Sequence, residues 1–305
     1  MMITQEKFDS GLVKLPGWFK QEIPDMNKVR LMKELFRGSR LHTVCESAHC
    51  PNMGTCWKEG VATFMILGGT CTRACRFCSV PAGRPDPVDG QEPQNVALAV
   101  KELGLRYVVV TSVARDDIAD EGASQFAETI YAIRRLTPEV KIEVLVPDFS
   151  AKEGSLRILS DAAPEVISHN IETVRRLSPY VRPQALHDRS LDVLRNFRKL
   201  APRAFVKSSL MVGLGETDEE IAQVMEELLG AGCQILTVGQ YLAPTRNRRH
   251  LPVTRFFSPQ EFEDLAQKGL KMGFAHVESG PLVRSSYIAE QGYKQALASF
   301  SRGGV

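Results

Sequence analysis

Apolar runs alternate with amphipathic segments along the chain from residue 62 onward. Short apolar runs are typical of buried strands, and six occur, at 62–67, 106–112, 141–146, 165–170, 204–212 and 234–239. Apolar residues at helical spacing predict helices at 93–103, 122–136, 152–162, 188–200, from 217 onward and at 258–271. The sequences at 217–220 and 258–261 are capping boxes, which predict helix starts. The pattern therefore predicts an α/β protein with a parallel sheet and right-handed crossovers.

The ends of the chain do not follow this alternation. The first 44 residues are predicted to form an extension, in which a turn at 15–19 carries two aromatic residues that pack on the main domain. Apolar residues at helical spacing predict a helix at 27–37. The polar segment at 280–287 predicts an irregular turn near the C-terminus.

The loop after the first predicted strand carries three cysteines in a C-x3-C-x2-C pattern, namely Cys71, Cys75 and Cys78. Three closely spaced thiolates suit an iron–sulfur cluster, because soft sulfur ligands hold iron and a short loop can enclose one face of a cube. A 4Fe–4S cube has four irons, so three ligands leave one iron open to a substrate or cofactor. Structural zinc is the alternative, although it prefers two separated cysteine pairs and four protein ligands.

A second group of cysteines precedes that strand in a C-x4-C-x5-C pattern, formed by Cys45, Cys50 and Cys56. A proline and a glycine within the pattern predict a loop, as a segment around a cluster requires. Zinc with His49 as the fourth ligand is the alternative here. Two separate sites, each lacking a fourth thiolate, favour two iron–sulfur clusters.

Composition narrows the class of protein. The 305 residues are 43% hydrophobic and 24% charged, enough for one large domain or two smaller ones. The net charge of +2 gives no support for nucleic-acid binding, and no apolar run approaches the ~20 residues that span a bilayer. The N-terminus lacks a signal or transit character, which predicts a cytoplasmic protein. Clustered cysteines in a reducing compartment indicate metal binding.

A motif near the C-terminus, Arg284-Ser285-Ser286-Tyr287, completes a combination with the two cysteine patterns. The combination resembles the lipoyl synthases, which belong to the radical S-adenosylmethionine (SAM) enzymes. The resemblance runs from about residue 16 to 287, with further matching stretches at 41–46, 111–113, 115–117, 169–173, 207–208, 210–217 and 239–242. The chain departs from the family pattern at 120–122, at 246–250 and at Ile288.

The resemblance implies an open partial (β/α)6 TIM barrel at 58–275, an N-terminal extension at 1–57 that carries the auxiliary-cluster cysteines, and a C-terminal tail at 276–305. Two 4Fe–4S clusters and SAM are the implied cofactors. Cys71, Cys75 and Cys78 would hold the cluster that cleaves SAM to a 5′-deoxyadenosyl radical. The auxiliary cluster would be held by Cys45, Cys50, Cys56 and a serine, assigned to Ser286 with Ser285 as the alternative.

Catalytic residues of barrels lie at the C-terminal ends of strands. Polar or glycine residues at four predicted strand ends are assigned to SAM: Thr111, Ser112, Asn170, Glu172, Gly213, Gly215 and Gln240. Arg284 is expected to close over the substrate.

The implied reaction inserts two sulfur atoms at C6 and C8 of an octanoyl-lysine, with the auxiliary cluster as sulfur donor. The implied partners are octanoylated lipoyl-carrier domains and an electron donor such as a ferredoxin or flavodoxin, with no nucleic acid and no membrane. A methylthiotransferase that acts on nucleic acid is one alternative, although no separate basic module is visible. A two-cluster electron carrier is another, but it would not need polar groups at the strand ends.

Overall fold

The computed structural model describes residues 15–20, 30, 34, 36, 38, 41–47, 50, 52–53, 56 and 62–302. His49 and most of the helix predicted at 27–37 lie outside these residues. The short 3-10 helix η2 (Gly17–Phe19) carries the predicted aromatic turn, and the Phe19 ring packs edge-on against Phe256 at 5.5 Å between centroids.

One sheet of eight strands, in the sequential order β1 to β8, organises the described chain. The six predicted strands are present and parallel: β2 (Ala62–Ile66), β3 (Tyr107–Ser112), β4 (Lys141–Leu145), β5 (Val166–Ser168), β6 (Phe205–Val212) and β7 (Ile235–Gln240). The prediction of only six strands was wrong, because β1 (His42–Thr43) pairs antiparallel with β2 and β8 (His276–Gly280) pairs parallel with β7. Both are short and lack an apolar run. Since β1 and β8 are the two edges in the described residues, the barrel is open.

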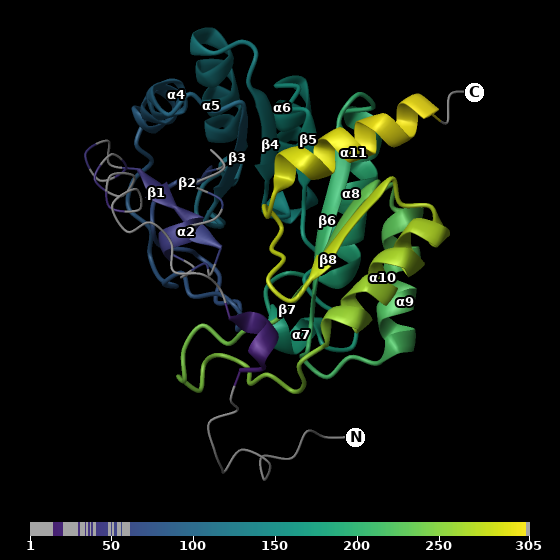
Figure 1. The fold of residues 1–305 in the computed structure, drawn as a ribbon. Coiled ribbons are helices and arrows are strands. Elements are labelled where there is room, and N and C mark those ends of the chain that lie inside the picture. The colour runs from purple at the N-terminus through teal and green to yellow at the C-terminus, as the bar shows by residue number, and fades with distance from the viewer. Residues whose placement is uncertain are drawn as a thin grey trace.

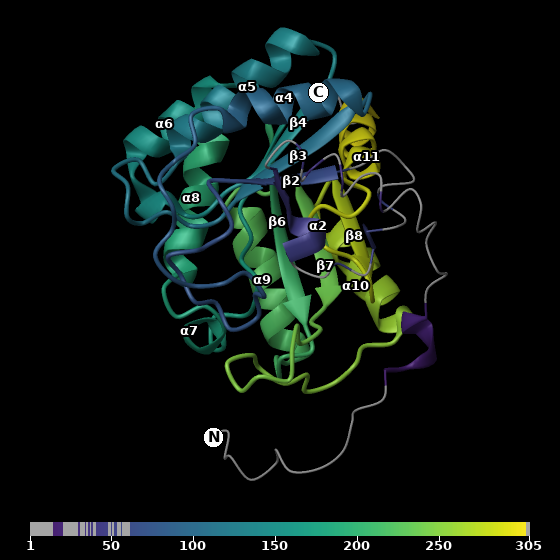
Figure 2. The same ribbon diagram turned by 90° about the vertical axis from the view of Figure 1, so that its left-hand side faces the viewer.

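Helices connect the parallel strands, as Figures 1 and 2 show. The main connecting helices are α4 (Glu92–Glu102), α5 (Ala123–Leu136), α6 (Glu153–Asp161), α8 (His187–Leu200), α9 (Asp218–Gly230) and α10 (Pro259–Met272), and the short ones are α2 (Val44–Ser47), η3 (Phe149–Ala151) and α7 (Ser178–Val181). Both predicted capping boxes are confirmed, because Thr217 and Ser258 each accept the N–H of the glutamate three residues later. The described helices include none that is both long and apolar enough to cross a bilayer.

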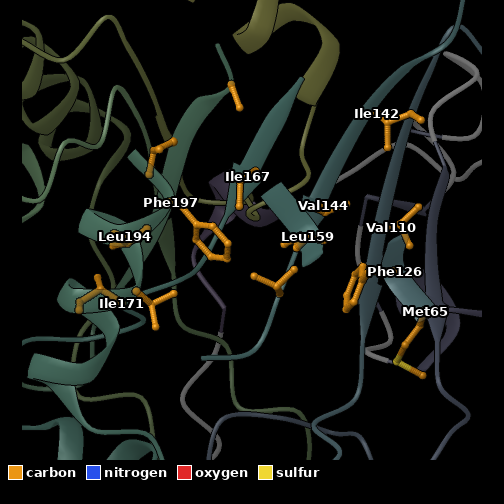
Figure 3. Close-up of a cluster of buried hydrophobic side chains, with 14 of the residues drawn as sticks. Met65, Val110, Phe126, Ile142, Val144, Leu159, Ile167, Ile171, Leu194 and Phe197 are labelled. Atoms are coloured by element: carbon orange, nitrogen blue, oxygen red, sulfur yellow. The ribbon is translucent and has the colours of Figure 1, made fainter. Parts of the chain in front are cut away.

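The main core lies between the sheet and the connecting helices. Figure 3 shows Phe126 of α5, Leu159 of α6 and Phe197 of α8 close to the strands, among side chains that include Val110 and Ile142. All five of these side chains are fully buried. Burial of each contributes about 1.5–3 kcal/mol, so this layer holds the strands in place for the groups at their ends.

Helix α11 (Ala289–Arg302) closes one end of the sheet (Figure 1). Its residues Tyr293 and Ala296 pack with Phe205 and Ile235, which are the first residues of β6 and β7. The irregular turn predicted at 280–287 is present from 281 to 288, but the regular β8 and α11 on either side were not predicted. Because α11 covers the N-terminal ends of the strands, their C-terminal ends remain for function.

Candidate active site

The first cysteine loop begins where β2 ends. Leu67 and Gly68 both adopt positive φ, which turns the chain sharply out of the strand. The Cys71 N–H donates to the Pro81 carbonyl at 2.8 Å, and the Gly83 N–H donates to the Cys71 carbonyl at 2.9 Å. These two bonds close the loop around the cysteines.

The three thiols of this loop lie close enough to interact electrostatically. Burial, together with the charges of Cys78, Glu172 and Cys71, raises the pKa of Cys75 to about 12. The Cys71 sulfur accepts backbone N–H bonds from Arg73 at 3.4 Å and from Ala114 at 3.3 Å. Such donors stabilise a thiolate, and metal binding displaces the thiol proton. Three soft donors close together fit a cluster, and the assignment of Cys71, Cys75 and Cys78 as its ligands stays a prediction.

A buried ionic network fixes this loop to the neighbouring strands. The Arg73 guanidinium lies 2.6 Å from an Asp116 oxygen and 2.7 Å from an Asp148 oxygen, and its side chain is only 7% exposed. Arg189 donates to the other Asp148 oxygen at 2.8 Å. Burial alone would raise the pKa of Asp148, but the hydrogen bond and charge of Arg73, together with the charge of Arg189, outweigh burial and lower this pKa to about 2. The network thus holds the loop against segments that follow β3 and β4.

His169, at the end of β5, lies beside this network as a neutral residue. Its Nδ1 lies 2.9 Å from the Val146 carbonyl, which can only accept, so Nδ1 carries the proton. Its Nε2 lies 2.9 Å from the Ser190 hydroxyl, which in turn accepts from Arg182 at 2.8 Å. Burial lowers the pKa of His169 to about 4. The ring therefore stays neutral at physiological pH.

Acidification from pH 6.5 to 4 is expected to destabilise the protein through His169. Its folded pKa of about 4 lies below its ordinary 6.5, so the unfolded state binds more protons in this window and stability falls with pH. At about 1.4 kcal/mol per unit, the loss approaches 3 kcal/mol. Urea unfolding of the wild type and of His169→Gln across this range measures it. The variant should start less stable but should lack this part of the pH dependence, and parallel curves would contradict the assignment.

The residues assigned to SAM at the ends of β3 and β5 fall into two groups. The Thr111 hydroxyl donates to the Leu145 carbonyl at 2.7 Å, so a strand already uses it. The Ser112 hydroxyl and the Asn170 Oδ1 are buried and have no hydrogen-bond partner among the described residues. Buried polar atoms are normally paired, so these two have free capacity for a polar ligand such as SAM. Asn170 also donates to Glu172 at 3.0 Å, and burial raises the pKa of Glu172.

The ends of β6 and β7 form a tight backbone cradle. Gly213 has a φ of 101°, and a Cβ there would lie 2.0 Å from the Gln240 amide nitrogen and 2.6 Å from the Arg255 carbonyl. The Gln240 nitrogen already donates to the carbonyls of Val212, Tyr241 and Arg255. Gln240 therefore mainly holds the loop after β7. Gly215 also has positive φ, and its carbonyl accepts from Arg176 at 2.8 Å.

The second cysteine group lies against the C-terminal motif. The Asn52 side chain donates to the Leu282 carbonyl at 2.5 Å. Burial, together with the Cys50 charge, raises the pKa of Cys56 to about 11, although a bond from the Ile288 N–H opposes this rise. Burial also raises the pKa of Cys50, and the Arg284 charge opposes that rise. The structure thus brings the Cys50–Cys56 segment and the Arg-Ser-Ser-Tyr motif together.

A glycine in β7 lets the backbone just before this motif pack closely against the strand. A Cβ on Gly239, in β7, would lie only 2.1 Å from the backbone carbonyl of Val283. Any side chain there would therefore displace the segment that carries Arg284 and Ser286. The two cysteine segments are also joined directly, because the Ser79 hydroxyl donates to the Ser47 carbonyl.

In the described part of the chain, no three His, Cys, Asp or Glu side chains are placed to hold a single metal ion. In a cluster, by contrast, each thiolate binds a different iron and the sulfur atoms stand further apart.

Comparison with known proteins identifies the family. Residues 65–228 match the model of the radical SAM superfamily. The chain is 55% identical over 276 residues to a lipoyl synthase of Rubrobacter xylanophilus, a match that covers 90% of this chain and 85% of that one. It is 50% identical over 296 residues to a lipoyl synthase of Geobacillus kaustophilus, which covers 97% of both chains. The chain belongs to the lipoyl synthase family.

A solved structure agrees with this at the level of the fold. Streptococcus suis SuiB bound to S-adenosylmethionine aligns with a TM-score of 0.51 and 11% identity, over 72% of this chain and 50% of that chain. This confirms the predicted α/β radical SAM fold for the present member of the lipoyl synthase family.

Two arginines near the cysteine loop of this lipoyl synthase fold were not singled out from the sequence. Arg73 lies between Cys71 and Cys75, and its charge is matched by Asp116, Asp148 and Glu121, all of them distant in sequence. Arg182 is buried, donates to the Asn170 carbonyl at 3.0 Å and acts electrostatically on Cys75 and Glu172. No local motif marks either one, because their partners lie on other loops.

Proposed function

We propose that this lipoyl synthase inserts two sulfur atoms at C6 and C8 of an octanoyl-lysine on a lipoyl-carrier domain, with an auxiliary cluster as the sulfur donor. The observation that carries the proposal is the convergence of two three-cysteine segments at one barrel. Ser79 joins the first segment to the α2 end of the second, and Asn52 joins the second to the C-terminal motif at Leu282. A radical formed beside one segment would therefore arise near the sulfur held by the other.

The cysteines divide the cofactors between them. Cys71, Cys75 and Cys78 would hold a 4Fe–4S cluster that would supply the electron for SAM cleavage, and the second group would hold an auxiliary cluster that would supply sulfur. The unactivated C–H bonds of an octanoyl chain resist acid–base chemistry, so a carbon radical is required. The second group comprises Cys45, Cys50, Cys56 and, as we assign it, Ser286.

Residues of the chain bind and orient the two substrates. The unpaired Ser112 hydroxyl and Asn170 oxygen are the best placed of the assigned side chains to accept or donate hydrogen bonds to SAM. Arg182 lies behind Asn170 and fixes its backbone. Burial lowers the pKa of Arg284, and the Cys50 charge partly opposes this effect. We assign the Arg284 side chain to close over the octanoyl arm.

The test is turnover of anaerobically reconstituted protein with an octanoyl-lysyl peptide, SAM and dithionite. We expect 5′-deoxyadenosine and a peptide that carries two sulfur atoms, with about eight irons per chain for two cubane clusters. Formation of 5′-deoxyadenosine without sulfur insertion would retain the radical chemistry and reject the substrate. Zinc, or a single cluster, would reject the proposal.

A further inference from the structure

A group of arginines lies beside the loop that carries the SAM-cleaving cluster ligands. The segment 242–254 contains three arginines and no Asp or Glu, and the cysteine loop at 69–85 is also free of acidic residues. We call four of these side chains the basic rim: Arg76, Arg246, Arg248 and Arg249. None of the four takes part in an ion pair within the described residues, unlike Arg73, Arg176 or Arg255. Their charge is therefore available to a partner.

The basic rim contacts the backbone of a cluster ligand. Arg249 donates to the Cys78 carbonyl at 2.9 Å and to the Val80 carbonyl at 3.2 Å. His250 also bonds the Cys78 carbonyl at 3.0 Å. Arg76 donates back to the Arg249 carbonyl at 3.2 Å. The rim is thus the protein surface directly over one ligand of the SAM-cleaving cluster.

The loop that presents the rim is internally hydrogen-bonded. The Thr245 hydroxyl lies 2.8 Å from His250 Nδ1 and accepts the Asn247 N–H at 3.1 Å. The His250 N–H donates to the Asn247 carbonyl at 2.9 Å. Arg246 and Arg248 project from this turn and are exposed. A loop that is already folded presents its charges to a partner at a low entropic cost.

We propose that the basic rim is the docking surface for a small acidic electron-carrier protein of the flavodoxin class. The inference rests on the proposed function, because a SAM-cleaving cluster must be reduced before each cleavage. An anionic flavin hydroquinone loses one electron and becomes the neutral semiquinone, and the cluster held by Cys71, Cys75 and Cys78 gains that electron. Complementary charge steers and orients such encounters. Electron-transfer rates fall steeply with distance, so the surface over Cys78 is the effective place to dock.

An octanoylated carrier domain fits this surface less well. Its arm must reach between the two cysteine segments, which meet where Ser79 bonds Ser47. Within the described residues, the hydrogen bonds of the Arg76 and Arg249 side chains join Cys78, Val80, His250 and the rim loop, and none of them joins the Arg-Ser-Ser-Tyr motif. The rim therefore contacts the first cysteine loop directly, and not the motif that we assign to the octanoyl arm.

Charge reversal tests the proposal on the complete holoenzyme. The double variant Arg246→Glu/Arg248→Glu changes only exposed side chains of the rim loop. The matched control Arg135→Glu/Arg203→Glu makes the same charge change at exposed positions near the starts of β4 and β6, the opposite end of the barrel. Calorimetric affinity for oxidised flavodoxin and the stopped-flow rate of cluster reduction by flavodoxin hydroquinone are measured at low and high salt.

At low salt we expect the flavodoxin affinity and the rate of cluster reduction of the rim variant to fall by about 10-fold or more. Both quantities should also depend less on salt than in the wild type. The control variant should stay near the wild type in both. Dithionite, which needs no docking, should support equal 5′-deoxyadenosine formation in all three proteins. Unchanged flavodoxin affinity in the rim variant would overturn the proposal. Weaker binding of the octanoylated carrier domain together with normal flavodoxin binding would also overturn the proposal. Failure of dithionite-driven SAM cleavage in the wild type would instead reject the proposed function, and the affinities would still decide docking.

Discussion

Replacement of Ser286 by cysteine is expected to give a protein that holds both clusters and cleaves SAM but forms almost no lipoyl product. A serine oxygen is a harder and less well matched ligand for iron than a thiolate. We infer that this bond opens when the auxiliary cluster gives up sulfur, and a thiolate would keep it closed. Since changes to groups around a metal site already cost about 10–100-fold in activity, the loss should be at least that large. Iron content, 5′-deoxyadenosine and sulfur-bearing peptide measure the three outcomes.

The neighbouring serine provides the control for this prediction. Ser285 and Ser286 are both partly buried in the turn between β8 and α11, so position alone does not separate them. Ser285→Cys should retain turnover if Ser286 is the ligand. The reverse result would move the ligand to Ser285, and full activity of both variants would reject the weak-ligand mechanism.

Replacement of Arg73 by leucine is expected to destabilise the fold by about 3–5 kcal/mol, because it leaves buried carboxylates without their main cation. Asp148 is fully buried and would keep only Arg189. The free energy of unfolding in urea measures the loss. Arg157→Leu is the matched control: it breaks an exposed ion pair with Glu153 and should change stability by less than about 0.5 kcal/mol. An equal effect of both variants would show that the buried network contributes little.

The same variant has a pH signature. Asp148 has a folded pKa of about 2, below its ordinary value of ~3.9. Its contribution is therefore present above about pH 4 and is lost as pH falls through about 2. Without Arg73 the pKa of Asp148 should rise, so the variant should lose stability at a higher pH than the wild type.

Most of the fold could be predicted from the sequence, because parallel strands and their connecting helices are marked by local sequence patterns. The runs at β2 to β7 and the capping boxes at Thr217 and Ser258 each depend on a few adjacent residues, and all were predicted. β1 and β8 were missed because their regular structure comes from pairing with β2 and β7, not from their own composition.

The site was predictable to the extent that ligand type and spacing define it. The cysteines of the first loop follow from their spacing, and the structure brings them together. The roles of Arg73, Asp148 and Arg182 depend on contacts that no local pattern reveals. Arg73 and Asp148, for example, are 75 residues apart in the sequence. The assigned SAM residues divide by a property that only the structure shows, namely whether their polar atoms are already bonded, as for Gln240, or free, as for Ser112.

The bond from Asn52 to the Leu282 carbonyl joins positions 230 residues apart. Closing so long a segment is slow and costs entropy that only the intervening sheet can offset. The first cysteine loop, by contrast, is closed by bonds between nearby residues, from the Cys71 N–H to the Pro81 carbonyl and from the Gly83 N–H to the Cys71 carbonyl. If the proposed function holds, maturation should follow an order: a partly folded chain could receive iron at Cys71, Cys75 and Cys78, whereas the segment with Cys50 and Cys56 could be loaded only after β8 has joined the sheet. Metal insertion at the second group of cysteines would then report on completed folding.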